Sequence, residues 1–177
     1  MTKQAHRSDL AHWIVNWLDG DHPPSHVMVG ATMANQHELD RDVLKLCAVP
    51  AAGRFISVEP MLGAISFEGL FANPTNAADG TNVLTLIDWV ICGGESGHGA
   101  RPVHPSWVRS LRDQCAAVGV PLLFKQWGEF IPKSNHPTLT ETSFNPDLMV
   151  RVGKTAAGRL LDGIEHIAFP SLPTTNR

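Results

Sequence analysis

The 177-residue sequence has few cysteines, no long apolar run and no block of charge of one sign. No stretch approaches the roughly 18 apolar residues of a membrane span, and the amino terminus lacks the apolar core of a secretory signal. Lys and Arg number 14 against 17 Asp and Glu, without a run of like charges, so non-specific nucleic-acid binding is not indicated. We therefore expect a cytoplasmic protein that does not act at a membrane.

Cysteine is too sparse for a disulfide framework or a cluster of thiolates. Cys47, Cys92 and Cys115 lie far apart in the sequence and form no CxxC pair. Cys47 and Cys115 fall on apolar faces of predicted helices, where we expect them to be buried. His98 and His104 follow Cys92 without the close ligand spacing of a zinc site, so we predict no metal site in this chain.

Hydrophobic periodicity alternates along the chain between helical and strand spacing. Helices are predicted over residues 10–18, after the capping-box pair Asn35 and Glu38, and after Pro105. Short apolar runs predict strands over 27–33, 54–60, 86–94 and 120–128. The strands recur at the roughly 30-residue interval of βαβ units. The pattern predicts an α/β fold, with a parallel sheet of about four strands and helical crossovers, or a section of a barrel.

The periodicity breaks down beyond Phe130. We predict a partial (β/α) barrel over residues 1–130 and an irregular C-terminal extension packed on it over 131–177. A short strand is expected within the segment MVRVG of this extension, and residues 73–82, rich in Asn, Ala, Gly and Thr, are expected to form a surface loop.

Polar residues follow three of the predicted strands, at the carboxyl ends where parallel α/β folds bind ligands. Because these strand ends share one edge of a parallel sheet, we expect their side chains to converge. A bidentate arginine in the next loop could hold a carboxylate or phosphate. The predicted ligand rim consists of Glu59, Gly93, Gly94, Glu95, Ser96, Arg101, Lys125, Gln126 and Trp127.

Each part of this rim has a functional and a structural interpretation. The glycines before Glu95 could let backbone N–H groups approach an anion or an amino-acid-like carboxylate. Lys125, after the apolar residues PLLF, needs a carboxylate partner, and either Glu59 or Glu95 could supply it. Alternatively, Glu95 caps the next turn and Trp127 packs in the core. The expected convergence at one strand end favours the functional interpretation.

Four blocks, FISVEPMLGAI, IDWVICGGESGHGARPVHPSWVRSLRDQC, GVPLLFKQWGEF and VRVGKTAAGRLLDG, resemble an uncharacterised phage-associated family named after phage gene products 37 and 68. The resemblance implies a phage or prophage protein with a domain of unknown function. It also implies the fold of radical S-adenosylmethionine enzymes, a partial (β/α) barrel, of which this chain resembles the second half. Full-length members carry a cysteine-rich, cluster-ligating segment before this region, and the chain lacks that segment. It would be a truncated protein, a split subunit or a protein with a start codon assigned too late.

The resemblance implies a protein that retains a substrate or cofactor rim without the iron–sulfur cysteine motif, and that is inactive as an isolated chain. No cofactor is expected in this chain, and S-adenosylmethionine and an iron–sulfur cluster are expected only if a missing N-terminal half is supplied. The alternative function is a non-catalytic binding or assembly subunit that completes a barrel with a partner chain, or self-associates through exposed strand edges. A third hypothesis is a hydrolase or transferase with Glu59 and Glu95 as acid and base.

Overall fold

A computed structural model describes residues 23–73, 80–133 and 148–171, together with residues 11–12, 14–17 and 19. Its main sheet has four strands: β1 (Met28–Thr32), β2 (Gly53–Val58), β3 (Trp89–Gly93) and β4 (Leu122–Gln126). They lie in the order β1-β2-β3-β4, and each neighbouring pair is parallel. The predicted parallel α/β sheet is confirmed.

Two long helices make the crossovers that flank this sheet. Helix α2 (Gln36–Ala48) joins β1 to β2, and helix α3 (Pro105–Val118) joins β3 to β4. Asn35 caps α2 by accepting a 3.1 Å hydrogen bond from the Glu38 N–H, while the Glu38 carboxylate accepts from the Ala34 N–H. Gly119 ends α3 in the left-handed region, with φ of 74°. The cap signals in the sequence therefore predicted both helix boundaries.

The described residues of the β2 to β3 connection form no long helix. It runs through an irregular segment and ends in the 3₁₀ helix η2 (Val83–Leu86), so β3 begins at Trp89 rather than at Leu86 as predicted. Gln36 of α2 bonds Ser66, and Gln114 of α3 bonds the Ile65 carbonyl and the Phe67 N–H. The connection therefore passes between α2 and α3. Residues 74–79 of the predicted surface loop lie outside the described residues.

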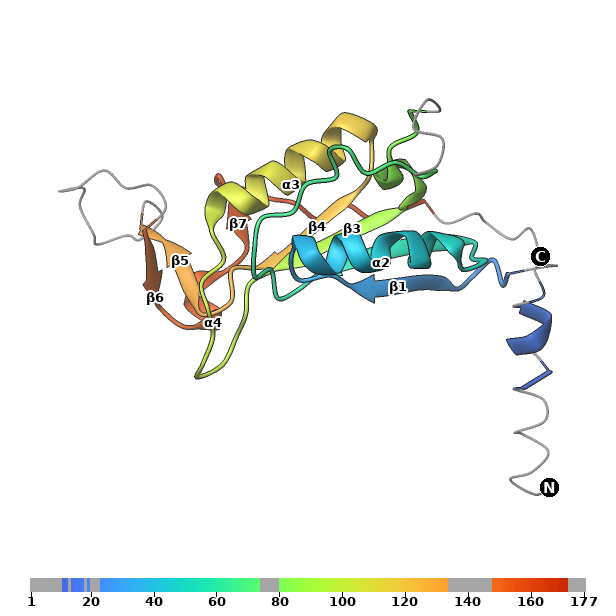
Figure 1. The fold of residues 1–177 in the computed structure, drawn as a ribbon. Coiled ribbons are helices and arrows are strands. Elements are labelled where there is room, and N and C mark those ends of the chain that lie inside the picture. Colours follow the sequence, from blue (N-terminus) through green and yellow to red (C-terminus); the bar gives the residue numbers. More distant parts are fainter. Residues whose placement is uncertain are drawn as a thin grey trace, which may run out of the picture.

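All three connections lie on one face of the sheet (Figure 1). Consecutive strand order with connections on one face is the arrangement found in a section of a (β/α) barrel. It lacks the reversal of strand order that marks a doubly wound sheet. Side chains on the helix-covered face form the core, and those of Ile56, Val58, Val90, Cys92 and Phe124 have 0% exposure.

The opposite face of the sheet is not covered by a described helix, and we call it the open face. Register places its side chains in two rows, one containing Phe55 and Trp89 and the next containing Ser57, Ile91 and Leu123. None of these residues is fully buried. Parallel sheets are normally covered on both faces, whereas the described residues leave this face half exposed.

The C-terminal part contains more regular structure than predicted. Strands β5 (Phe130–Pro132) and β6 (Met149–Arg151) form an antiparallel hairpin, which confirms the strand expected in MVRVG. Helix α4 (Lys154–Ala157) precedes a second small hairpin of β7 (Leu160–Leu161) and β8 (Ile164–Glu165). The described part of this extension packs against the main sheet and α3.

Residues 166–169, which we call the C-terminal strap, lie along the outer edge of β4. The Phe124 N–H donates to the His166 carbonyl at 2.9 Å, and the Ala168 N–H donates to the Leu122 carbonyl at 3.2 Å. The Trp89 indole N–H bonds the Ala168 carbonyl, and the Phe169 ring lies 5.3 Å from the Trp89 ring. This edge of the parallel sheet is thus closed by an antiparallel segment of the same chain.

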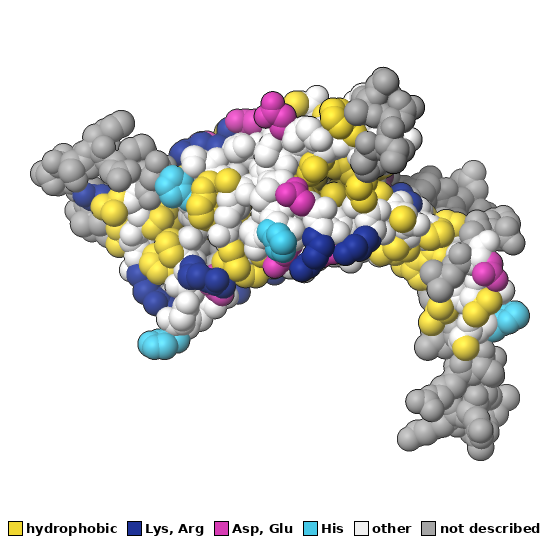
Figure 2. Space-filling view, in the orientation of Figure 1, with side chains coloured by type: hydrophobic (Ala, Val, Ile, Leu, Met, Phe, Trp, Pro, Cys, Tyr) yellow, Lys and Arg dark blue, Asp and Glu magenta, His cyan; other side chains and the backbone are white. Residues whose placement is uncertain are grey.

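The described residues of the first predicted helix, 11–12 and 14–17, are helical. The Trp17 indole donates to the Pro50 carbonyl at 2.5 Å, whereas Ile14 and Val15 are exposed. In Figure 2 this segment projects from the body of the molecule. No helix among the described residues has the length and apolar character needed to cross a membrane.

Candidate ligand-binding rim

A β-bulge at the end of β4 builds the principal polar cluster. Phe124 pairs with Cys92, but Gly93 pairs with Gln126, so Lys125 is an extra residue in β4. Simple alternation would place Lys125 and Gln126 on opposite faces of the sheet. The bulge instead lets consecutive side chains reach the same side, a common way of re-aiming a side chain beside a functional site.

Both side chains meet Glu59, which directly follows β2. The Lys125 ammonium lies 3.1 Å from Glu59 Oε2, and the Gln126 amide donates to Glu59 Oε1 at 3.2 Å. The Glu59 side chain is only 18% exposed, while that of Lys125 is 56% exposed. We call Glu59, Lys125 and Gln126 the Glu59 cluster. Of the two carboxylates expected as the partner of Lys125, the structure selects Glu59.

Trp127 belongs to the core rather than to the predicted rim. It is 1% exposed, and its ring meets Phe124 edge-on with centroids 4.9 Å apart. Its indole N–H donates to the Leu160 carbonyl at 2.8 Å. The bulge explains the difference, because one extra residue reverses the facing of the positions that follow. The packing alternative for this residue is therefore the correct one.

The adjacent glycines allow close packing of the backbone. The Gly94 N–H already donates to the Gln126 carbonyl at 2.8 Å, and the Gly93 carbonyl accepts from the Met61 N–H. A Cβ at Gly94 would lie 1.9 Å from the Trp127 carbonyl oxygen, and one at Gly93 would lie 3.1 Å from the Glu59 carboxylate. Of the backbone N–H groups expected to approach a ligand here, that of Gly94 is therefore bonded within the sheet.

Glu95 forms a separate ion pair with Arg101 in the loop after β3. Arg101 donates through Nε at 2.8 Å, through Nη2 at 3.0 Å and through its backbone N–H at 2.9 Å. These bonds, the side-chain ones first, lower the pKa of Glu95 to about 2. The ion pair therefore favours the ionised form of Glu95, which argues against Glu95 as the acid of an acid–base pair with Glu59.

Residues 96–99 of the loop after β3 are exposed. The sequence analysis did not identify the two side chains that bind this loop. Ser96 is exposed, and residues 94–101, which we call the glycine-rich loop, project beyond the sheet in Figure 1. Glu129 and Arg151 contact this loop but were absent from the predicted rim. The sequence feature that could have identified Glu129 is its position directly after the block FKQWG.

Cys92 and Cys115 are core residues, whereas Cys47 is partly buried beside the core. Burial raises the pKa of the Cys115 thiol to about 12, and it also raises the pKa values of Cys92 and Cys47. Such thiols resist the ionisation that metal and cluster ligation requires. Among the described residues, no group of three or more His, Cys, Asp or Glu side chains is arranged to hold a metal ion.

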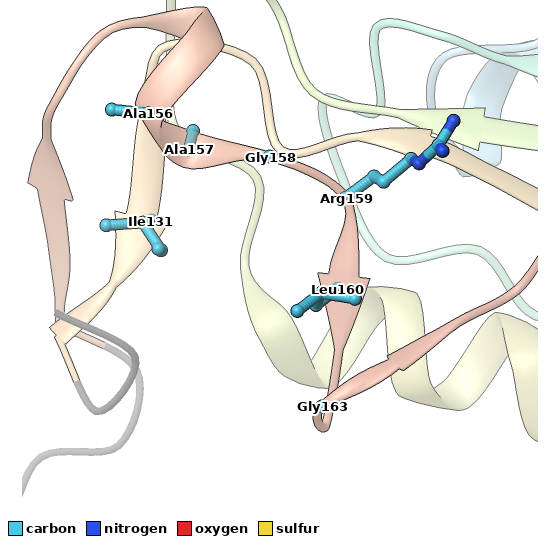
Figure 3. Close-up of a pocket in the computed structure, with 7 residues that line it drawn as sticks. All are labelled: Ile131, Ala156, Ala157, Gly158, Arg159, Leu160 and Gly163. Carbon is cyan, nitrogen blue, oxygen red and sulfur yellow. The ribbon is translucent and has the colours of Figure 1, made fainter. Parts of the chain in front are cut away.

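A small apolar pocket of about 260 Å³ lies between β5 and β7 (Figure 3). Its only charged lining residue, Arg159, pairs with Glu165 at 3.1 Å. The pocket shares no residue with the predicted rim. Its lining consists of Ile131, Ala156, Ala157, Gly158, Arg159, Leu160 and Gly163.

The fold and the Glu59 cluster define the class as a parallel α/β domain with polar groups at the carboxyl ends of its strands. The chain belongs to the family described as "Protein of unknown function (DUF5131)", which matches residues 1–170. No curated protein and no solved structure matches the chain.

Proposed function

We propose that this chain forms the second half of a radical-SAM-like partial (β/α) barrel, encoded by a phage or prophage and working in the cytoplasm. In this proposal it supplies a rim for a substrate or cofactor. The observation that carries the proposal is the bulge that brings Lys125 and Gln126 to Glu59 at the carboxyl ends of the strands. The sequential strand order and the open face support it, because the inner face of a barrel section lacks its own helices.

The Glu59 cluster has the chemistry to recognise an amino-acid-like group. The exposed Lys125 ammonium uses one contact for Glu59 and has further N–H donors for a carboxylate or phosphate. The Glu59 carboxylate accepts two bonds and has lone pairs left for a donor on the same ligand. A ligand with an anionic group beside a hydrogen-bond donor would complement both residues.

The chain is proposed to hold no cofactor by itself. Three thiols with raised pKa values, two of them buried and one partly buried, do not fit an iron–sulfur cluster, which needs thiolates held close together. In this proposal S-adenosylmethionine and a cluster bind only when an N-terminal half is supplied. Anaerobic treatment of the chain with iron and sulfide should therefore produce no visible cluster absorption. A stoichiometric cluster would refute this part of the proposal.

The rim is tested by titrating the full chain with L-methionine, whose carboxylate lies beside an ammonium donor, and following the NMR resonances of the chain. We expect shifts of the Gln126 side-chain amide and the Gly93 N–H, and we expect Lys125→Met to remove them. Lys154→Met is the matched control, because Lys154 is an exposed lysine on α4 outside the Glu59 cluster. Absence of shifts in the wild type, or identical shifts in Lys125→Met, would refute the rim.

A second candidate is a non-catalytic assembly subunit that completes a barrel with a partner chain or a copy of itself. The outer edge of β1 favours it, since no described residue pairs with that edge. An unpaired edge is a template for another strand. Sedimentation velocity should then show self-association that grows with concentration. A monomer at every concentration would leave only the partner-chain form of this function.

A further inference from the structure

The β5–β6 hairpin holds the glycine-rich loop through hydrogen bonds. Arg151 of β6 donates from Nη2 to the Gly97 carbonyl at 2.7 Å and from Nη1 to the His98 carbonyl at 3.0 Å. One planar guanidinium therefore bridges two successive peptide groups of the loop. A lysine ammonium lacks this fixed fork of donors.

Glu129, in the segment between β4 and β5, also binds the glycine-rich loop. Its Oε1 accepts the Gly97 N–H at 3.1 Å, and its Oε2 lies 3.6 Å from Arg151 Nη2. The Glu129 side chain is 17% exposed. Its backbone is fixed as well, because its N–H donates to the Glu95 carbonyl and its carbonyl accepts from the Val152 and Gly153 N–H groups. Gly97 is thus held at both its N–H and its carbonyl.

A second brace lies inside the loop. Glu95 at its start binds Arg101 at its end through three hydrogen bonds, and the Ala100 N–H donates to the Gly97 carbonyl. Glycine-rich segments lose more conformational freedom on ordering than others. Holding such an exposed segment in one shape therefore requires specific bonds, which the loop and the hairpin provide. Ser96 and His98 remain exposed between the two braces.

We infer that Arg151 and Glu129 are positioning residues that fix the glycine-rich loop, and that Ser96 and His98 are the specificity-determining side chains that the loop exposes after the carboxyl end of β3. In this inference the β5–β6 hairpin contributes to the ligand rim by holding the glycine-rich loop in place. The task of Ser96 and His98 rests on the proposed function, whereas the fixing of the loop does not.

The fixing is tested by amide hydrogen exchange on the full chain. In Arg151→Gln we expect the bonded amides Gly97, Ala100 and Arg101 to exchange about tenfold faster, since bonds to a charged group are lost. Arg151→Lys keeps the charge but not the fork, and we expect an intermediate increase. Arg159→Gln is the matched control, because that arginine makes its ion pair outside the loop.

Two results would overturn the fixing role. One is loop exchange that is unchanged in both Arg151→Gln and Glu129→Gln. The other is an increase of equal size in the loop and in α3, which would show a general loss of stability. Unchanged α3 exchange with a faster loop supports the inference.

The task of the loop is tested with L-methionine. Arg151→Gln and His98→Ala should each weaken its binding several-fold, while Arg159→Gln should not. Wild-type binding that is unaffected by Arg151→Gln and His98→Ala would refute the specificity role alone. Absence of wild-type binding would refute the proposed function and leave the exchange result standing.

Discussion

The two edges of the main sheet end in different ways. The outer edge of β4 is paired with the C-terminal strap, and the hairpin before the strap is tied to α3 through Asp162. The outer edge of β1 has no partner among the described residues, and β1 contains none of the lysine or proline residues that commonly protect an edge. Within the described part of the chain, the sheet is closed at β4 and open at β1, so a further strand would add at β1.

The backbone of β1 shows which groups such a strand would meet. The Met33 N–H donates to the Ser57 carbonyl, toward β2. Because N–H groups alternate in direction along a strand, those of Thr32 and Gly30 point to the outer edge. These two residues therefore allow the open edge to be changed without loss of a bond to β2.

The largest difference between the edges is expected from glycine substitutions. Gly94→Ala should destabilise the chain by about 3 kcal/mol or more, because its Cβ would meet fixed backbone at Trp127. At the open edge, a Cβ at Gly30 would lie 2.3 Å from the Phe55 ring, which has the open face to move into. Gly30→Ala should therefore cost less. Urea unfolding measures both.

Gly99→Ala is the control for this pair, since a Cβ there would meet no atom within 4 Å. It should change stability by no more than about 0.5 kcal/mol, as most surface substitutions do. Equal losses in Gly94→Ala and Gly30→Ala would contradict the difference in rigidity between the two edges.

Hydrogen exchange should separate the edges in the unmodified chain. The Phe124 and Ala168 amides are bonded across the closed edge, whereas the Thr32 and Gly30 amides face outward from the open one. We expect the closed-edge amides to exchange at least about 100-fold more slowly at low protein concentration. Comparable rates at both edges, measured by NMR, would mean that the C-terminal strap does not protect β4 in solution.

Asp162 provides a smaller and pH-dependent test of the closed edge. It accepts hydrogen bonds from Arg109 at 2.7 Å and from Arg112 at 2.8 Å, and these bonds hold its pKa below the usual range. Asp162→Asn should cost about 1 kcal/mol at neutral pH, a modest value because the side chains are partly exposed. Asparagine tolerates the positive φ of 53° at this position, so the substitution tests charge.

The sign of the pH effect follows from the lowered pKa. The stabilising contribution of Asp162 is complete above its unfolded pKa, about 4, and is lost as the pH falls toward its folded value. The stability difference between the wild type and Asp162→Asn should therefore shrink below about pH 4. A difference that stays constant from pH 7 to pH 3 would show that the ion pair does not secure the hairpin.

The smallest effect on stability is expected at the open edge itself. Thr32→Pro removes an outward N–H and should change the unfolding free energy by only about 1 kcal/mol or less. If β1 mediates self-association, this variant should lose it, while Thr32→Val, which keeps the N–H, should retain it. Sedimentation of both variants decides the matter, and unchanged association in Thr32→Pro would exclude the β1 edge.

The sequence predicted the local elements better than the positions of side chains at the strand ends. Spacing of the apolar runs located four strands and their parallel order, because each crossover unit is encoded by consecutive residues. Cap signals at Asn35, Pro105 and Gly119 are equally local. The convergence of Glu59 with Lys125 and Gln126 was partly foreseeable, since carboxyl ends of parallel strands meet at one edge.

What escaped prediction depends on distant partners. The bulge arises from how β4 pairs with β3, which no periodicity in β4 alone reveals. The burial of Trp127 depends on a hydrogen bond to the Leu160 carbonyl. The conformation of the glycine-rich loop depends on Arg151, more than 50 positions from Gly97. Closure of the β4 edge by the C-terminal strap has no counterpart in local sequence patterns.

The extra residue in β4 also determines which side chains at this strand end face the Glu59 cluster and which face the core. If β4 instead paired with β3 without the bulge, with Lys125 rather than Gln126 opposite Gly93, regular alternation would turn the Gln126 amide under the helices and bring the Trp127 indole out into water. A hydrogen-bonding group and a large aromatic ring would exchange surroundings at once. One β-bulge therefore sets both the polar side and the core side of this strand end, and a change in the bulge would alter both sides together.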